Sequence, residues 1–189
     1  MPNVIVIAGA NGAGKTTLAP FLLRDVFGIS EYVNADTIAA GLSAFAPENS
    51  AFEAGRIMLA HIRGLAKKQK DFAFETTLAS RFYAGWLRRR QSEGYHFHLI
   101  FLYLPSAELA VERVKSRIRL GGHSIPQNVI RRRYAAGLRN FFEMYQPIAD
   151  SWRFYEASET PSLIASGAKD GKINLVKAGL WNKIIKLKQ

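Results

Sequence analysis

The chain has 189 residues, of which 48% are hydrophobic and 22% are charged, a balance typical of a globular protein with one packed core. It has no cysteine, which excludes a disulfide framework and a thiolate metal site. No apolar stretch approaches the roughly 20 residues that span a bilayer, and the first apolar run is too short for a signal peptide. We therefore expect a cytoplasmic protein with no membrane partner.

The charge is strongly basic. The chain carries 26 Lys plus Arg against 15 Asp plus Glu, a formal net charge of +11. Such an excess favours polyanionic partners, among them nucleotides, sugar nucleotides, nucleic acids and acidic proteins. Charge alone does not choose among these classes.

The first half of the chain alternates apolar runs, which predict strands, with amphipathic segments, which predict helices. Phe52 and Met58 lie on the apolar face of the longest of these helices, for which Pro47 is a typical first residue. The elements expected here are a strand over 4–8, a glycine loop over 9–14, a helix over 15–27, a strand over 31–34 and a helix over 47–70.

The second half continues the same alternation. The elements expected here are a strand over 72–74, a helix over 81–93, a strand over 95–104, helices over 107–119 and 127–145, and last strands over 152–156 and 173–176. Strands that alternate with helices indicate an α/β fold of three layers, in which helices cover both faces of a mostly parallel sheet. With neither a repeat nor a low-complexity linker, residues 1–189 are predicted to form one domain.

A phosphate-binding loop follows the first strand. The segment GANGAGKT satisfies the spacing G-x-x-x-x-G-K-[ST], with a strand before it and a helix after it. Its glycines allow backbone N–H groups to surround an anion, Lys15 is expected to reach the β- and γ-phosphates, and the Thr16 hydroxyl is expected to bind Mg²⁺. The motif thus predicts ATP and Mg²⁺ as cofactors. The predicted nucleotide-binding residues are Gly9, Ala10, Asn11, Gly12, Ala13, Gly14, Lys15, Thr16 and Thr17.

Asp36 follows the second expected strand. In open α/β sheets ligands bind outside the carboxyl ends of the strands, so this carboxylate is expected beside the γ-phosphate. There it can orient an acceptor hydroxyl and take its proton, or hold Mg²⁺ through water. The alternative is that Asp36 is the N-cap of a helical turn that begins at Thr37.

Glu75, Thr76 and Thr77 stand just past the third expected strand, at the same edge of the sheet. A carboxylate beside two hydroxyl groups suits a sugar or nucleoside acceptor, and Glu75 and Thr77 are therefore candidate substrate-binding residues. The alternative is a polar turn between a strand and a helix.

An arginine-rich segment over 113–134 consists of a helix, a glycine-containing loop and a second helix, which together resemble a lid. Arginines of such a lid can bind phosphates and neutralise charge in the transition state. Arg113 and Arg117 lie one helical turn apart on one face, so they are the candidate catalytic arginines. His123, between a glycine and a serine, is a candidate ligand contact.

Four segments together resemble the zeta-toxin-like P-loop kinases, in particular the branch described as predicted ATPases. They are GANGAGKTT over 9–17, NAD over 34–36, FETTL over 74–78 and RIRLGGHSIPQNVIRRRY over 117–134. The glycine loop is shared with many proteins, whereas the order of all four is far more specific.

The resemblance implies a P-loop kinase fold and a role for each matching residue. It implies that Asp36 is the base toward the acceptor hydroxyl, that Glu75 and Thr77 contact the acceptor, and that Arg113 and Arg117 bind ATP phosphates. Characterised zeta toxins phosphorylate a hydroxyl of a UDP-N-acetylamino sugar. The resemblance therefore implies a sugar nucleotide as acceptor and an antitoxin protein as partner.

Two further functions remain open from the sequence. The charge and the arginine clusters are consistent with a nucleic-acid-dependent ATPase or a polynucleotide kinase. The second open function is a regulatory module that binds nucleotide without transferring phosphate. The carboxylates of Asp36 and Glu75, which are suited to phosphate transfer, argue against it. Because spaced aromatic residues in a basic stripe are missing, we do not expect specific nucleic-acid binding and favour a kinase of small molecules.

Overall fold

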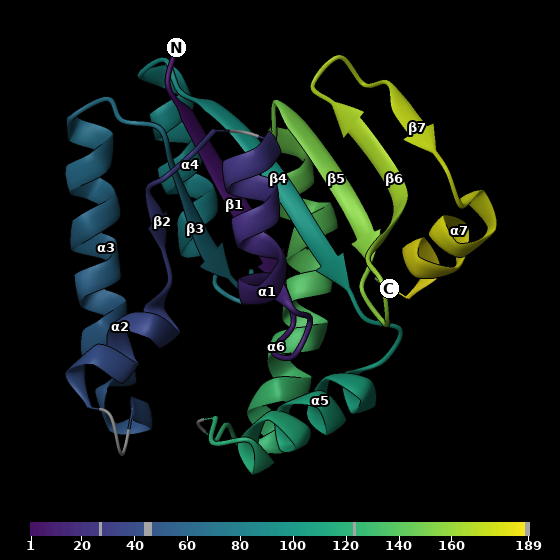
Figure 1. Cartoon of the computed structure of the whole chain (residues 1–189). Helices are drawn as coiled ribbons and strands as arrows, with labels where there is room; N and C mark the ends of the chain where they lie inside the picture. The colour runs from purple at the N-terminus through teal and green to yellow at the C-terminus, as the bar shows by residue number, and fades with distance from the viewer. Residues whose placement is uncertain (27, 44–46, 123, 188–189) are drawn as a thin grey trace.

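The computed structural model describes residues 1–26, 28–43, 47–122 and 124–187 (Figure 1). Its strands are β1 (Asn3–Gly9), β2 (Tyr32–Val33), β3 (Phe72–Thr76), β4 (His96–Tyr103), β5 (Ser151–Glu156), β6 (Ser162–Ala168) and β7 (Ile173–Leu175). Its α-helices are α1 (Lys15–Pro20), α2 (Ala35–Leu42), α3 (Ala51–Lys67), α4 (Phe82–Ser92), α5 (Ala107–Arg119), α6 (Gln127–Asn140) and α7 (Ala178–Lys186). Its other helical segments are η1 (Phe21–Val26), η2 (Pro47–Ser50), η3 (Phe141–Tyr145) and η4 (Gln146–Ile148).

The seven strands form one sheet in the order β2-β3-β1-β4-β5-β6-β7. The first five strands of this order are parallel, and β6 and β7 add to the sheet in antiparallel fashion. Parallel strands end at the same edge, and in Figure 1 this edge faces α2 and α5. The loop after β1 and the turn after β3 therefore meet side by side.

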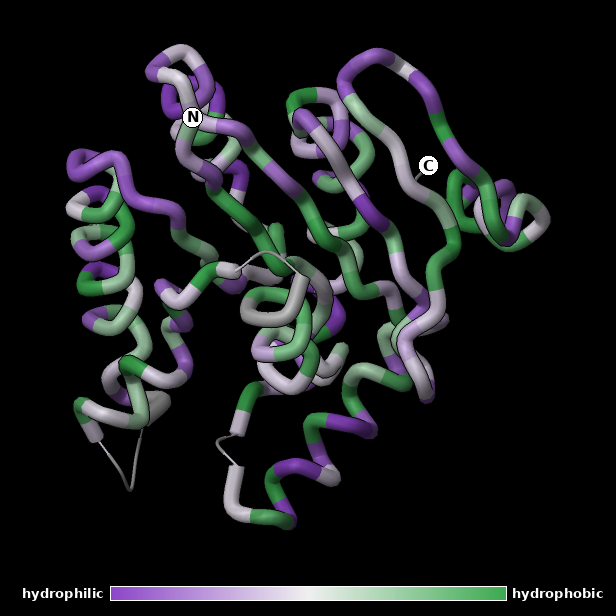
Figure 2. Tube along the Cα trace, turned by 45° about the horizontal axis from the view of Figure 1, so that its top comes forward, coloured by the Kyte–Doolittle hydropathy of each residue, from purple (hydrophilic) through white to green (hydrophobic). Residues whose placement is uncertain are grey.

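Helices cover both faces of the sheet, which gives the predicted three layers. The side chains of β1 alternate between two cores, with Val4 and Val6 on one face and Ile5 and Ile7 on the other. One core includes apolar residues of α3, α4, α6 and α7, and the other includes those of α1 and α5. A strand buried on both faces is a continuous apolar run, and Figure 2 shows such runs in the central strands.

Two predicted helices continue at their C-terminal ends as π-helices. The helix expected over 15–27 is α-helical to Pro20 and continues as the π-helix η1. Pro20 has no N–H to donate and its ring crowds the preceding turn, which is a physical reason for a change of helix type there. The helix expected over 127–145 likewise changes to the π-helix η3 at Phe141.

Other details differ from the sequence prediction. The long helix begins at Ala51, after the short 3-10 turn η2, and Phe52 is 82% exposed rather than buried. Strand β6 was not predicted, because its run of small and polar residues lacks an alternating pattern. None of the described helices has the length and apolar composition needed to cross a membrane.

Candidate active site

The glycine loop turns sharply out of β1 beneath the end of β4. Gly9 has φ 144°, a backbone conformation that residues other than glycine rarely adopt. A Cβ atom there would also collide with the carbonyl oxygen of Leu102. Ala10 and Ala13 of the loop are buried in the core shared with α5. Ala10 and Ala13 anchor the loop to the core, while Asn11, Gly12 and Gly14 line a cavity on its other side.

Lys15 is the first residue of α1 and is buried at 6% exposure. Its Nζ donates hydrogen bonds to the carbonyl oxygens of Gly9 (3.0 Å) and Ala10 (2.9 Å) and lies 3.7 Å from Oε1 of Glu75. Burial lowers the pKa of Lys15, and the negative charges of Glu75 and Asp36 oppose that effect. The ammonium group is thus held inside the glycine loop, where the motif requires it.

Glu75 joins the glycine loop to its neighbours. Strand register places it beside Ile7 of β1, and its Oε2 accepts hydrogen bonds from Thr16 Oγ1 (2.9 Å), Tyr32 OH (2.5 Å) and Asn34 Nδ2 (3.1 Å). Burial first, and then the carboxylate, raise the pKa of Tyr32, so the phenol stays a donor. Glu75 therefore contacts the predicted Mg²⁺ ligand Thr16 directly, which its assignment to the acceptor alone did not anticipate.

Asp36 lies in the first turn of α2 and is exposed. The N-cap of this helix is Asn34, whose Oδ1 accepts a hydrogen bond from the Asp36 N–H at 2.8 Å. The alternative reading of Asp36 as an N-cap is therefore wrong. The helix does not need its carboxylate as a cap, and that carboxylate borders the cavities described next.

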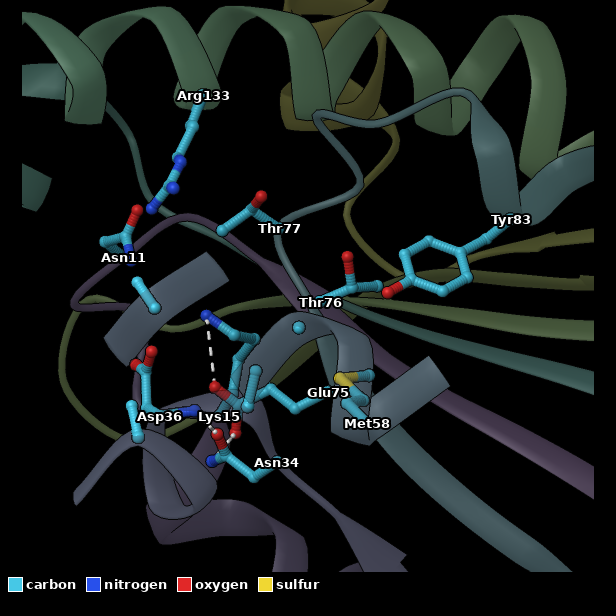
Figure 3. Close-up of a pocket in the computed structure, with 14 residues that line it drawn as sticks. Asn11, Lys15, Asn34, Asp36, Met58, Glu75, Thr76, Thr77, Tyr83 and Arg133 are labelled. Carbon is cyan, nitrogen blue, oxygen red and sulfur yellow. Dashed lines mark hydrogen bonds and ion pairs between the residues drawn. The ribbon is translucent and has the colours of Figure 1, made fainter. Parts of the chain in front are cut away.

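Two cavities meet at this edge of the sheet. The first, which we call the P-loop cavity, has a volume of about 250 Å³ and is lined by Asn11, Gly12, Gly14, Lys15, Thr16, Thr17, Asp36, Glu75, Arg113 and Arg117. The second, the lateral cavity, has a volume of about 220 Å³ and is lined by Asn11, Lys15, Asn34, Ala35, Asp36, Ala39, Ala51, Gly55, Met58, Glu75, Thr76, Thr77, Tyr83 and Arg133 (Figure 3). Asn11, Lys15, Asp36 and Glu75 line both.

The two candidate arginines of α5 both reach the P-loop cavity. Arg113 Nη1 donates to the carbonyl oxygens of Ala157 (2.7 Å) and, at 3.4 Å, Gly12, so it ties the glycine loop to the end of β5. Nε and Nη2 of Arg117 are buried and have no hydrogen-bond partner within the described structure. Unpaired guanidinium donors beside a phosphate loop are suited to bind phosphate oxygens. His123, the other candidate in this segment, lies outside the described residues.

Thr77, a predicted substrate-binding residue, lines the lateral cavity, and α6 fixes the turn that carries it. Asn140 Nδ2 donates to the carbonyl oxygens of Leu78 (2.8 Å) and Ala79 (3.3 Å), and Tyr145 OH donates to that of Ser80 at 2.5 Å. Leu78 has φ 56°, a strained conformation for a residue with a side chain. The turn is thus held in a costly shape by partners from α6 and η3.

Arg133 is the site residue that sequence reasoning missed. It projects from α6 into the lateral cavity (Figure 3), whereas Arg131 and Arg132 are exposed. The sequence signal is the helical spacing to Ile130 and Gly137, three positions before and four after Arg133. Both are buried in the structure, so Arg133 lies on the inward face of the helix. Within a run of arginines, only the position of each residue around the helix tells which side chain faces the protein.

The residues at the junction suit a magnesium ion bound with a nucleotide. The Thr16 hydroxyl and the carboxylates of Glu75 and Asp36 offer oxygen ligands, the kind that Mg²⁺ prefers. Within the described residues no group of three or more His, Cys, Asp or Glu could hold a metal by itself. Such a site fits an ion that takes its remaining ligands from phosphates and water.

Known proteins resemble this chain in sequence and in fold. The sequence model described as "Zeta toxin" matches residues 1–166. An uncharacterized protein of Haemophilus influenzae is 26% identical over 132 residues, which are 70% of this chain and 92% of that protein.

Solved structures share the fold at low identity. The complex of AvrRxo1-ORF1 and AvrRxo1-ORF2 with ATP has a TM-score of 0.78 at 18% identity, and the match covers 97% of this chain and 63% of that one. The chain therefore spans less than two thirds of that relative. The PezAT toxin–antitoxin system of Streptococcus pneumoniae has a TM-score of 0.64 at 16% identity, covering 99% of this chain and 86% of that one.

Proposed function

Because the chain belongs to the zeta toxin family and has the fold of a P-loop kinase, we propose that it transfers the γ-phosphate of ATP to a hydroxyl group of a small molecule. One observation carries the proposal: the P-loop cavity and the lateral cavity share Asn11, Lys15, Asp36 and Glu75. A phosphate bound in the first cavity and a hydroxyl group bound in the second would meet at these four residues.

The P-loop cavity is the donor side. Lys15 would bind the β- and γ-phosphates, and Arg117, whose buried donors have no partner in the described part of the chain, would bind the γ-phosphate. Arg113 would act chiefly through Gly12, which it holds in place. Thr16, with Glu75 or Asp36 through water, would hold Mg²⁺, which when bound neutralises charge on the β- and γ-phosphates.

The lateral cavity is the acceptor side. The acceptor oxygen would attack the γ-phosphorus, so that one P–O bond forms while the bond to the β–γ bridging oxygen breaks and ADP leaves. Asp36 would accept the hydroxyl proton, since its carboxylate borders both cavities. Glu75 is committed to Lys15, Thr16, Tyr32 and Asn34, which makes it the weaker candidate for the base.

A UDP-N-acetylamino sugar is the first acceptor to test, because the family resemblance implies it. An antitoxin protein is the partner that we propose, supported by two structural neighbours that are complexes, AvrRxo1-ORF1 with AvrRxo1-ORF2 and PezAT. The acceptor and the antitoxin are both proposals here, because this chain covers only 63% of the AvrRxo1 chain that it matches.

The test is transfer of label from γ-labelled ATP to a metabolite extract, with products identified by mass spectrometry. UDP-N-acetylamino sugars and an RNA oligonucleotide with a 5′-hydroxyl are assayed in parallel. We expect a labelled small molecule with the wild-type protein and none with Lys15→Ala. Label on the oligonucleotide alone would favour a polynucleotide kinase, and ATP hydrolysis without any labelled acceptor would contradict the proposal.

A further inference from the structure

Arg133 is a half-buried cation that faces the lateral cavity. Neither a hydrogen bond nor an ion pair joins its side chain to any described residue. Its neighbours behave differently: Arg131 pairs with Glu108 at 2.8 Å on the surface, and Arg132 is exposed. A cation that is drawn partly out of water and left unpaired costs free energy, so its position calls for a ligand.

Two polar groups face the same space. Figure 3 shows the guanidinium of Arg133 directed toward Asn11, with Thr77 to one side of it. Asn11 is 7% exposed, and its Oδ1, an acceptor, has no partner in the described part of the chain, so this atom is available to a hydrogen-bond donor and not to an anion. The Thr77 hydroxyl accepts a hydrogen bond from the Ala79 N–H at 3.4 Å, which leaves its own proton to donate. The guanidinium of Arg133 and the Thr77 hydroxyl are donors suited to an oxyanion, whereas the Asn11 amide oxygen can accept a hydrogen bond from a hydroxyl group of the same ligand.

The packing of α6 fixes this arrangement. A Cβ atom at Gly137 would collide with the carbonyl oxygen of Thr77, so the glycine lets the helix lie directly against the turn. Arg133 stands one helical turn before Gly137 and is therefore held above the cavity. Its place follows from close packing and does not depend on a flexible loop.

Arg133 does not belong to the donor side. Arg113 and Arg117 line the P-loop cavity. Arg133 lines the lateral cavity and does not line the P-loop cavity. The lateral cavity also contains the carboxylates of Asp36 and Glu75, which would repel an anionic ligand. A cation at the other side of the cavity would offset that repulsion.

We propose that Arg133, with Thr77, binds an anionic group of the acceptor, a phosphate ester or a carboxylate, while the reacting hydroxyl group lies toward Asp36. This inference rests on the proposed function, because it names the class of acceptor that the kinase takes. Arg133 is then a specificity-determining residue, and neutral sugars and nucleosides are poor acceptors. Apolar residues of α2 and α3, such as Ala39 and Met58, line the cavity between these polar groups.

The first test measures anion binding with the donor side filled. The protein is saturated with Mg²⁺ and a non-hydrolysable ATP analogue, and inorganic phosphate is then titrated by calorimetry. We expect phosphate to bind, and Arg133→Gln to weaken it about ten- to a hundredfold, the usual worth of a charge-assisted hydrogen bond. Arg132→Gln is the matched control, with the same charge change on an exposed neighbour, and should change binding less than about twofold. Equal weakening by both variants, or no binding to the saturated protein, would overturn the inference.

The second test uses transfer itself. The metabolite extract is divided by anion exchange at neutral pH, and each fraction is assayed with γ-labelled ATP. We expect the labelled product from the retained, anionic fraction, with Arg133→Gln raising the acceptor KM at unchanged KM for ATP and Arg133→Lys restoring part of the loss. Product from the neutral flow-through would overturn the inference and leave the proposed function intact. Product from neither fraction would contradict the proposed function, and the phosphate titration would still decide whether Arg133 binds an anion.

Discussion

The two cavities are built in opposite ways. The P-loop cavity draws six of its ten lining residues from the continuous segment 9–17. The lateral cavity is assembled from the glycine loop, α1, α2, α3, the end of β3 and the turn after it, α4 and α6, most of which are far apart in the sequence. A continuous motif keeps its geometry through its own backbone, whereas a dispersed cavity has the shape that helix packing gives it.

This difference predicts that the two sides can be damaged separately. Changes within the glycine loop should affect ATP binding and transfer together. Changes at the lateral cavity should affect the acceptor and leave ATP binding unaltered. The four residues that line both cavities are the exception, and at these the two effects must be separated by the choice of substitution.

The largest effect is expected for Lys15→Ala. Transfer should be abolished and ATP binding weakened, because the ammonium group meets the phosphates as a point charge and also holds Glu75. Isothermal titration with ATP and a transfer assay measure both, with the exposed Lys68→Ala as control. Unchanged affinity with full activity would mean that the glycine loop does not bind nucleotide here.

Asp36→Asn should separate chemistry from binding. We expect transfer to fall by about two to four orders of magnitude, the usual worth of a general base, with little change in ATP affinity. The melting temperature should be nearly constant, because Asn34 and not Asp36 caps α2. An active Asp36→Asn enzyme would reject this role and make Glu75 the next acid to test.

Gly55→Leu should block the lateral cavity by filling it. A Cβ atom at Gly55 would meet no other atom within 4 Å, so a larger side chain can enter the cavity without displacing α3. We expect the acceptor KM to rise about tenfold or more, equivalent to about 1.4 kcal/mol or more, with ATP affinity unchanged. Gly64→Leu on the same helix, exposed and outside the cavity, is the control. Equal effects of both variants on the acceptor would mean that it binds elsewhere.

The smallest effect concerns stability, at Gly137. Helix propensity alone predicts that Gly→Ala stabilises a helix by about 1 kcal/mol. Because a Cβ atom at Gly137 would collide with the Thr77 carbonyl, we expect Gly137→Ala to destabilise the protein by about 1–3 kcal/mol instead. Urea unfolding measures the change, and Gly85→Ala, in open space on α4, should show the stabilisation that propensity predicts. A gain in stability at both positions would show that α6 can move away from the turn.

Much of the fold was predictable from the sequence, because its signals are local. A buried strand followed by a glycine loop and a helix identified β1, the loop and Lys15 without any knowledge of the rest. Asp36, Glu75 and Thr77 were predicted for a related reason: parallel strands end at one edge, so polar residues near those ends must lie close together. Glu75 was expected just past its strand, but β3 extends to Thr76 and includes it. Strand β6 escaped because antiparallel pairing with β5, and not its own pattern, makes it a strand.

The tertiary structure alone decided how the lateral cavity is formed. Nothing local distinguishes Asn140 from a surface asparagine, yet its amide holds the turn that presents Thr77. The sequence contained the helical phase of Arg133 but not the element that its face would meet. Close packing at Gly137 sets that neighbour, because contacts between segments some 60 residues apart depend on how whole elements pack and not on the residues beside them in the chain.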